Sequence, residues 1–226
     1  MTLLAHQTEI RFPSIEKGEA RVHRLPLLRA SRQTLAGFGE IVPDFGSAKV
    51  KMTPWPLKGW RPMSAGVIGN EAGEVEGAFS MWAEGGLLFG RNEAVKRAYI
   101  IGWYDDPAIA RRDREPRSRD CLYIYQANYH PDGGQIWYPR QGIPFVAVLA
   151  KPTDDVRPED FVAFYCDGSF GIQILPEVWH QPAAPIGTGM TVDNKQGRVH
   201  ACVDFNALSE FDCYLQVPLT LDAIAA

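Results

Sequence analysis

The chain has 226 residues, of which 46% are hydrophobic and 22% are charged, and its formal net charge is −4. These values are ordinary for a folded globular protein and exclude a largely disordered chain. Basic and acidic residues are interspersed, so we expect no nucleic-acid partner, and no apolar run approaches the roughly 20 residues that a membrane-spanning helix needs.

The size and the cysteine pattern limit the organisation further. All-β domains commonly reach this length, so we expect residues 1–226 to form a single domain. The first fifteen residues lack the charged-then-apolar order of a secretory signal, which favours a cytoplasmic location. The four cysteines (Cys121, Cys166, Cys202 and Cys213) are widely spaced without a Cys-x-x-Cys pair, so we expect them to be small buried apolar residues.

Taken in chain order, the first predicted element is a short helical turn that Ser31 caps and that ends before Gly37. An irregular insertion is expected over about 53–77, because this stretch holds three prolines and several glycines. A second irregular insertion, about 105–120, mixes both charges and predicts a solvated loop. Further on, Pro158 followed by two acidic residues predicts another short helix that continues through Phe164.

Strand signals dominate the rest of the chain. Short segments rich in aromatic and β-branched residues are bounded by Gly, Pro, Asp and Asn, which is typical of strands in a barrel or sandwich. The predicted strands are 98–104, 121–125, 135–138, 144–149, 170–175, 189–193, 199–205 and 213–217.

Two short motifs, about fifty residues apart, indicate the functional site. Residues 130–135 read His-Pro-Asp-Gly-Gly-Gln, and residues 177–182 read Glu-Val-Trp-His-Gln-Pro. Each motif places one histidine, His130 or His180, beside a turn-forming residue at a strand edge. Because barrel strands far apart in sequence can face one cavity, we expect both histidines to line a single site.

The first motif is similar to the metal-binding hairpin of cupin barrels, which reads His-x-His-x(4)-Glu and is completed by a histidine from a second hairpin. His130 takes the place of the second histidine, Gln135 that of the carboxylate and Asn128 that of the first histidine, while His180 supplies the second hairpin. A divalent metal held by His130, Gln135 and His180 is one option. Two of the four positions are neutral amides, which are weak ligands for transition metals, so no cofactor is predicted firmly.

Several segments together resemble the ureidoglycolate lyase family of the cupin superfamily. Residues 35–42, 130–135, 144–150 and 178–182 follow the family's order, and they meet its patterns His-Pro-x-Gly-x-Gln and Val-Trp-His-x-Pro. The resemblance implies an all-β dominated, cupin-like β-barrel or jelly roll with a few short covering helices. It also implies a homodimer that acts in allantoin (purine) catabolism and cleaves a small molecule, ureidoglycolate, to glyoxylate and urea.

The chain departs from the family pattern at three places, one of which is Asn128-Tyr129, where members typically carry Glu-Arg before His-Pro. Gln181 stands where members usually carry a second histidine, and an arginine beside the strand that ends at Trp103 is missing. These changes suggest a pocket for a related ureido or amide-bearing carboxylic acid.

The resemblance also suggests roles for individual residues. His130 and His180 would form the acid–base pair, because imidazole titrates near neutral pH. Substrate contacts would come from Gln135, Tyr138, Arg140, Trp103 and Gln181, with Arg140 pairing with the substrate carboxylate. The remaining histidines, His6, His23 and His200, are predicted to be structural.

Two other functions stay open on the sequence. A non-catalytic cupin-like protein that binds a small metabolite would tolerate the replaced ligands. A metal-dependent dioxygenase or isomerase would require a metal despite the two amides.

Overall fold

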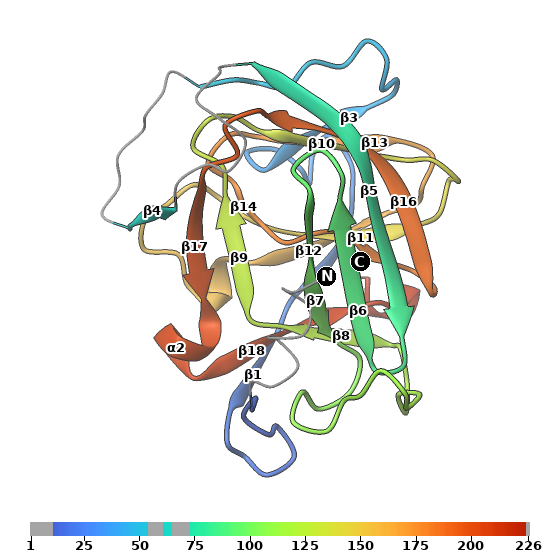
Figure 1. The fold of residues 1–226 in the computed structure, drawn as a ribbon, viewed down its shortest axis with the longest axis vertical. Coiled ribbons are helices and arrows are strands. Elements are labelled where there is room, and N and C mark those ends of the chain that lie inside the picture. Colours follow the sequence, from blue (N-terminus) through green and yellow to red (C-terminus); the bar gives the residue numbers. More distant parts are fainter. Residues whose placement is uncertain (1–10, 54–60, 65–72, 225–226) are drawn as a thin grey trace.

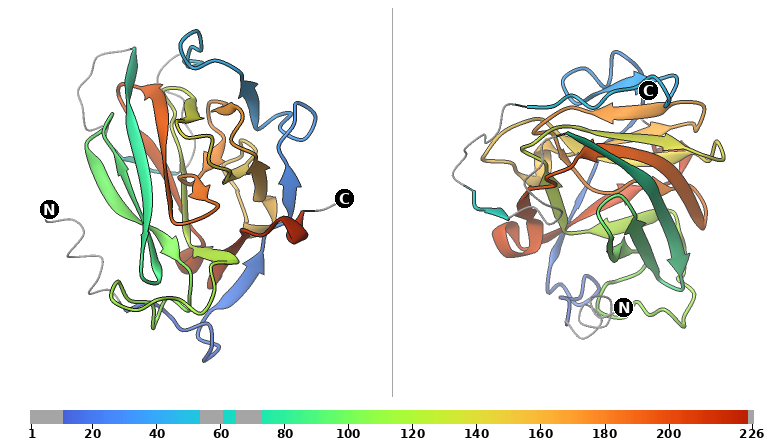
Figure 2. Two further views of the ribbon diagram at one scale, coloured as in Figure 1. Left: turned by 90° about the vertical axis from the view of Figure 1, so that its right-hand side faces the viewer. Right: turned by 45° about the horizontal axis from the view of Figure 1, so that its top comes forward.

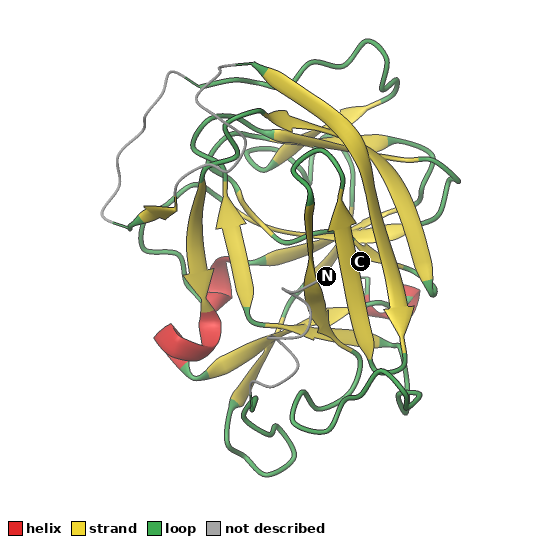
Figure 3. Cartoon of the chain, viewed as in Figure 1, coloured by secondary structure: helices red, strands yellow, loops and turns green. Residues whose placement is uncertain are grey.

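The computed structural model of the protein describes residues 11–53, 61–64 and 73–224. Strands dominate this part of the chain, and the helices in it are few and short (Figure 3). The strands form two sheets that lie around a common apolar core (Figures 1 and 2). This arrangement confirms the predicted all-β class and is consistent with a cupin-like fold.

The larger sheet has ten strands. In chain order they are β1 (Arg21–Arg24), β3 (Gly39–Val42), β5 (Glu74–Glu84), β6 (Leu87–Asn92), β7 (Arg97–Trp103), β8 (Cys121–Ile124), β10 (Gln135–Pro139), β13 (Gly171–Ile174), β16 (Gly189–Gly197) and β18 (Cys213–Pro218). Their spatial order is β1-β18-β8-β7-β6-β5-β16-β10-β13-β3. The pair β1–β18 at one edge is parallel, whereas the long neighbours β5, β6 and β16 are antiparallel.

The smaller sheet has eight strands. They are β2 (Leu27–Arg29), β4 (Met63–Ser64), β9 (Gln126–Tyr129), β11 (Phe145–Ala150), β12 (Val162–Cys166), β14 (Trp179–His180), β15 (Ala184–Pro185) and β17 (Cys202–Asn206). Their order is β2-β12-β11-β14-β9-β17-β4, and β15 pairs with β11. In Figure 1, β9, β14 and β17 lie side by side opposite the long strands β5, β6 and β16.

Burial along the strands explains why these segments pair. All six residues of β11 are buried, as expected for an apolar run whose two faces are both covered. On β16, burial first alternates, with Met190 and Val192 facing the core. Residues two positions apart on a strand point to the same face, so Asn194 and Gln196 follow Met190 and Val192 and place two amide side chains in the interior.

The eight predicted strands all correspond to observed strands, although their ends shift by up to four residues. The strands that were not predicted are β1 to β6, β9, β12, β14 and β15. β5 mixes Glu, Gly and Ser with apolar residues, so its composition gives only a weak strand signal.

The helices differ more from expectation. The prediction of a helix through Phe164 was wrong, because only Pro158–Asp160 is helical, as the 3₁₀ turn η1, and the aromatic residues that follow pair with β11 as β12. At Ser31 there is a turn in which the Ser31 hydroxyl accepts a hydrogen bond from the Thr34 N–H, as the predicted cap requires. An unpredicted helix, α2 (Ala207–Phe211), is capped by Asn206. A second 3₁₀ turn, η2, spans Leu221–Ala223.

The two predicted insertions have different outcomes. Residues 54–60 and 65–72 lie outside the described part, but Met63–Ser64 and the stretch from Glu74 belong to strands, which corrects the prediction of an irregular segment there. The segment 105–120 is a loop of turns and bends, as predicted. Among the described ranges, no helix has the length and apolar character needed to cross a membrane.

Candidate active site

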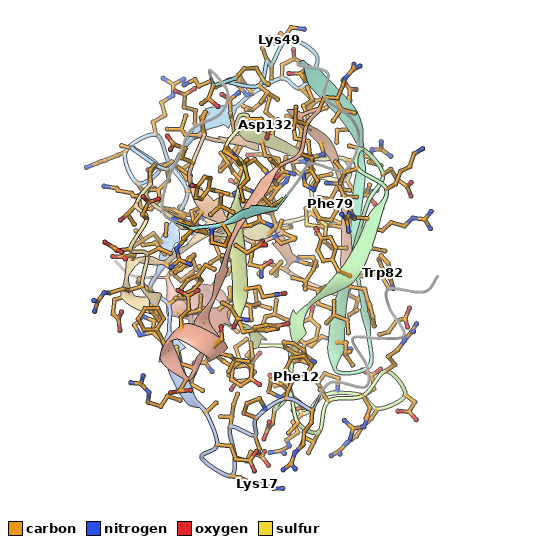
Figure 4. All side chains as sticks on the ribbon, turned by 60° about the vertical axis from the view of Figure 1, so that its left-hand side comes forward. Phe12, Lys17, Lys49, Phe79, Trp82 and Asp132 are labelled. Atoms are coloured by element: carbon orange, nitrogen blue, oxygen red, sulfur yellow. The ribbon has the colours of Figure 1, made fainter. Side chains whose placement is uncertain are left out.

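A cavity of about 290 Å³ receives residues from both sheets, and no lysine or arginine is among its described lining residues. The sheets contribute Phe79, Asn92, Tyr99, Ile100, Gln126, Ala127, Asn128, Gln135, Trp137, His180, Asp204, Phe205 and Asn206, and the connections add Val95, His130, Gln181, Pro182 and His200. Figure 4 shows Phe79 and Asp132, the latter in the loop after His130, in the upper half of the molecule. The cavity is therefore framed by polar and aromatic groups.

His130 lies in the connection between β9 and β10 and is buried. Its Nδ1 is 3.0 Å from the Ala201 carbonyl oxygen, so a neutral ring donates its N–H there. The lone pair then resides on Nε2. The His130 ring centroid lies 5.0 Å from that of His180, in an edge-on arrangement. The structure thus brings together the two histidines that the sequence singled out.

His180, on β14, is held by two carbonyl oxygens. Its Nδ1 lies 2.8 Å from the Val178 backbone oxygen, and its Nε2 lies 3.0 Å from Gln135 Oε1. Both ring nitrogens are therefore engaged by hydrogen-bond acceptors.

His200, for which the sequence predicted a structural role, also lines this cavity. Its ring centroid is 4.7 Å from that of His130, and its Nδ1 accepts a hydrogen bond of 2.7 Å from Gln196 Nε2. Its backbone has φ of 48°, in the left-handed region that residues other than glycine seldom occupy. Such strain is concentrated at functional sites.

Buried amides connect these histidines. Gln135 Nε2 donates to Asn194 Oδ1 at 2.6 Å, Asn194 Nδ2 donates to Gln196 Oε1 at 3.0 Å, and Asn92 Nδ2 donates to the same oxygen at 2.9 Å. We call these four side chains the amide network. It links His180 at one end to His200 at the other, and it forms because Gln135 lies opposite Gln196 in the β10–β16 register.

Burial lowers the pKa of all three histidines. The pKa of His180 falls to about 3, with the neighbouring His130 as the second cause, and that of His200 falls to about 2 through burial and then His130 and Arg97. The pKa of His130 is lowered as well, although the Ala201 carbonyl opposes this change. At neutral pH the rings are neutral, so each has one N–H and one lone pair.

The predicted metal ligands do not fit a metal ion. Both nitrogens of His180 face carbonyl oxygens, and Gln135 Oε1 is one of them. No lone pair of His180 is therefore directed towards a position that His130 and Gln135 share. Within the described residues, the group with metal-ligand spacing is a different one: single ligand atoms of His130, His200 and Cys202 lie within 4.8 Å of one another.

The substrate-binding residues predicted from the sequence divide into two groups. Gln135 and Gln181 line the cavity, and the Gln181 amide donates to the Gln126 carbonyl. Trp103 is buried elsewhere, with its ring 4.5 Å from that of Phe12, which lies towards the opposite end of the molecule from Asp132 (Figure 4).

Tyr138 and Arg140 also lie outside the cavity lining. Tyr138 follows Trp137 on β10, so it points to the opposite face of the strand, where its hydroxyl donates to the Pro43 carbonyl. Arg140 is half-exposed and forms an ion pair of 2.8 Å with Asp193. The structure therefore does not bring either side chain to His130.

Replacing Arg140 by glutamine is expected to leave the KM and kcat for a carboxylate substrate within about twofold of the wild type, because an exposed ion pair contributes little and lies away from the cavity. Steady-state kinetics measure this effect. A KM increase of tenfold or more would place Arg140 in the substrate site.

The sequence contained a signal for the residues that were missed. Asn194 and Gln196 are two positions apart on a strand whose other inward residues are apolar, so a pair of inward amides was readable from the alternation. His200 had no comparable signal, because it lies in the connection after β16.

Comparison with known proteins covers most of the residues that line this cavity. A family model described as ureidoglycolate lyase matches residues 115–210, which include all three cavity histidines. The chain is 32% identical to a ureidoglycolate lyase of Rhodobacter capsulatus over 110 residues, or 44% of this chain and 68% of that protein.

Two further relatives are matched over shorter stretches. The ureidoglycolate lyase of Azotobacter vinelandii is 39% identical over 61 residues, 27% of this chain and 37% of the relative. That of Pseudomonas savastanoi pv. phaseolicola is 34% identical over 82 residues, 36% of this chain and 48% of the relative. In each case the chain spans less than half of the relative. With its strand-dominated fold, its two histidine motifs and its match to two thirds of the Rhodobacter protein, the chain belongs to the ureidoglycolate lyase family.

Proposed function

We propose that the protein is a lyase that cleaves the carbon–nitrogen bond of ureidoglycolate, or of a related ureido or amide-bearing carboxylic acid, in this cavity. The observation that carries the proposal is the orientation of His130. Its Nδ1 is held by the Ala201 carbonyl, which leaves a neutral imidazole with its lone pair on Nε2 at the wall of the cavity. Membership of the ureidoglycolate lyase family supports the same reaction class.

The reaction needs one proton to move between two atoms of the substrate. Ureidoglycolate carries a hydroxyl and a ureido nitrogen on the same carbon. His130 Nε2 removes the hydroxyl proton while the carbonyl of glyoxylate forms and the carbon–nitrogen bond breaks, and the same proton then passes to the departing nitrogen to give urea. One imidazole can perform both transfers, because the lowered pKa keeps it neutral before the reaction.

The other cavity groups have supporting roles in this proposal. Gln196 donates to Nδ1 of His200, so the neutral His200 ring carries its hydrogen on Nε2 and can donate it to a substrate oxygen. His180 is engaged by Val178 and Gln135 and does not exchange the proton, although the sequence assigned it to the acid–base pair. Burial raises the pKa of Asp204, the carboxyl group that also lines the cavity.

The biological setting also belongs to this proposal. The family suggests a homodimer that acts in allantoin catabolism. Four cysteines without a disulfide fit a reducing compartment such as the cytoplasm. Light scattering of the purified protein measures the oligomeric state, and a monomer would contradict the homodimer.

The test is the release of glyoxylate from racemic ureidoglycolate by the full-length protein, with allantoate as a second ureido acid. Enantioselective release supports the lyase function. If neither compound is cleaved but one of them raises the melting temperature, the chain is a binding protein and not a lyase.

A further inference from the structure

Arg97 lies just beyond the lining residues of the cavity, on the face of the larger sheet that forms its wall. It is the first residue of β7 and lies directly opposite Asn92, the last residue of β6. Directly opposed residues of an antiparallel pair project to the same face of the sheet. Asn92 lines the cavity, and so does Tyr99, two positions after Arg97 on the same strand. The strand geometry therefore directs the Arg97 side chain to the cavity side of the sheet.

The Arg97 side chain is half-buried, and within the described ranges none of the ion pairs includes it. Two other basic side chains, both buried, have partners: Arg61 pairs with Glu210, and Lys195 donates to two backbone carbonyls. A guanidinium has five N–H donors and remains charged, so a partly buried one gains stability from an anionic acceptor. Arg97 thus has donors to offer a molecule that enters the cavity.

The positive charge of Arg97 acts on groups at the cavity wall. Burial lowers the pKa of His200, and the charges of His130 and then Arg97 add to this effect. Burial raises the pKa of Tyr99, and the charge of Arg97 opposes that change. His200 and Tyr99 both line the cavity. An anion at this part of the wall would therefore be attracted by the same charge.

The two sheets differ in the charge that they bring to the cavity. Arg97 belongs to the larger sheet, whereas Asp204, on β17 of the smaller sheet, is the acidic residue among the described lining residues. An ionised Asp204 repels a carboxylate and attracts N–H groups, while the planar guanidinium fork pairs with a carboxylate. A ureido acid has a carboxylate at one end and N–H groups at the other, so these charges favour one orientation of it.

We propose that Arg97 binds the carboxylate of the substrate, so that the ureido group faces the smaller sheet and the cavity selects ureido acids over their neutral amides. The identity of the substrate rests on the proposed lyase function, whereas the carboxylate site rests on the placement of Arg97. Arg97 takes the role that the sequence suggested for Arg140, whose guanidinium is paired with Asp193 outside the cavity.

The experiment compares the binding of oxalurate and of its neutral amide to the full-length protein by isothermal titration calorimetry. Oxalurate is a ureido acid without the carbinol hydroxyl that the reaction needs, so binding is measured without turnover. The wild type should bind oxalurate about 10- to 100-fold more tightly than the amide, because charged hydrogen bonds distinguish the two. Arg97→Gln should bind both compounds equally, and Arg97→Lys, which keeps the charge but not the fork, should show an intermediate preference.

Arg91→Gln is the matched control. Arg91 is next to Asn92 on β6, so it projects to the opposite face, where it is exposed and pairs with Glu93. This variant should keep the wild-type preference for oxalurate. Thermal unfolding shows whether each variant is folded.

Steady-state kinetics with ureidoglycolate give a second measurement. A contact that the substrate and the transition state share affects KM more than kcat, so Arg97→Gln should raise KM about 10-fold or more with little change in kcat. Arg91→Gln should leave KM within about twofold of the wild type.

The role of Arg97 would be overturned if the wild type binds oxalurate no more tightly than the amide or binds neither, or if Arg97→Gln keeps the preference. Glyoxylate release with an unchanged KM in Arg97→Gln would also refute this role and leave the lyase function intact. Oxalurate binding that depends on Arg97, in a protein that releases no glyoxylate, would refute the lyase function and leave the carboxylate site intact.

Discussion

Replacement of His130 by asparagine is expected to reduce glyoxylate release by about 10²- to 10⁴-fold, which is the contribution of a positioned general base. The asparagine amide can replace Nδ1 as the donor to the Ala201 carbonyl, so the loop should keep its conformation. What the variant lacks is the lone pair of Nε2. The measurement is kcat/KM with ureidoglycolate at neutral pH.

A matched control separates this effect from a general loss of histidine. His23 lies on β1, outside the lining of the cavity, so His23→Asn should retain the wild-type rate. Thermal unfolding of both variants shows whether the fold is intact. If His130→Asn folds and keeps more than about a tenth of the wild-type kcat/KM, His130 is not the base.

The second large effect concerns stability in acid. His180 and His200 are neutral in the folded protein because their pKa values fall to about 3 and about 2, whereas an unfolded histidine has a pKa near 6.5. Below pH 6.5 the unfolded chain therefore binds more protons, and stability decreases as the pH falls towards the folded pKa values. When the pH falls from 7.5 to 5, each of these two histidines should lower the free energy of unfolding by about 2 kcal/mol, so the pair lowers it by about 4 kcal/mol.

Urea unfolding at pH 7.5 and pH 5 measures this loss, and two variants assign it. Asparagine tolerates the left-handed backbone at position 200, so His200→Asn is the least disruptive replacement. The free energy of unfolding at pH 7.5 exceeds that at pH 5, and this excess should be about 2 kcal/mol smaller in His200→Asn, and likewise in His180→Gln, than in the wild type. An unchanged difference in both variants would show that other groups cause the acid sensitivity.

The sequence predicted the fold class because strand composition is a local property. Segments such as 145–150 are apolar throughout, and they become strands covered on both faces. Composition predicted the wrong secondary structure where pairing with a distant strand decides the conformation. Phe161–Phe164 follows a proline and two acidic residues, which are helix-start signals, but pairing with β11 makes these residues extended.

The site was predicted in part for a similar reason. His130, Gln135 and His180 belong to recognisable motifs, and the structure gathers them around one cavity. Arg140 was selected for its charge alone, and the sequence could not show that Asp193 already pairs with it. His200 reaches the cavity because the chain turns back after β16, and no local pattern encodes that path.

The amide network has a direction, and that direction is set by a backbone group outside the network. The Ala94 N–H, in the turn between β6 and β7, donates to Asn92 Oδ1 and so fixes which end of that amide faces Gln196. Each following amide must then present its oxygen on the same side, since reversing one of them would set two oxygens or two NH₂ groups against each other.

The series ends with Gln135 Oε1 facing His180, whose other nitrogen faces Val178. A neutral His180 ring has one N–H but faces two acceptor oxygens, so one oxygen receives no hydrogen from it. Only an imidazolium, with two N–H groups, would donate to both oxygens. Hydrogen bonding and burial therefore act in opposite directions on the same ring. The Ala94 peptide group thus determines that the cavity wall offers an incoming molecule a surplus of acceptors, and a ligand that brings a hydrogen of its own would complete the pattern.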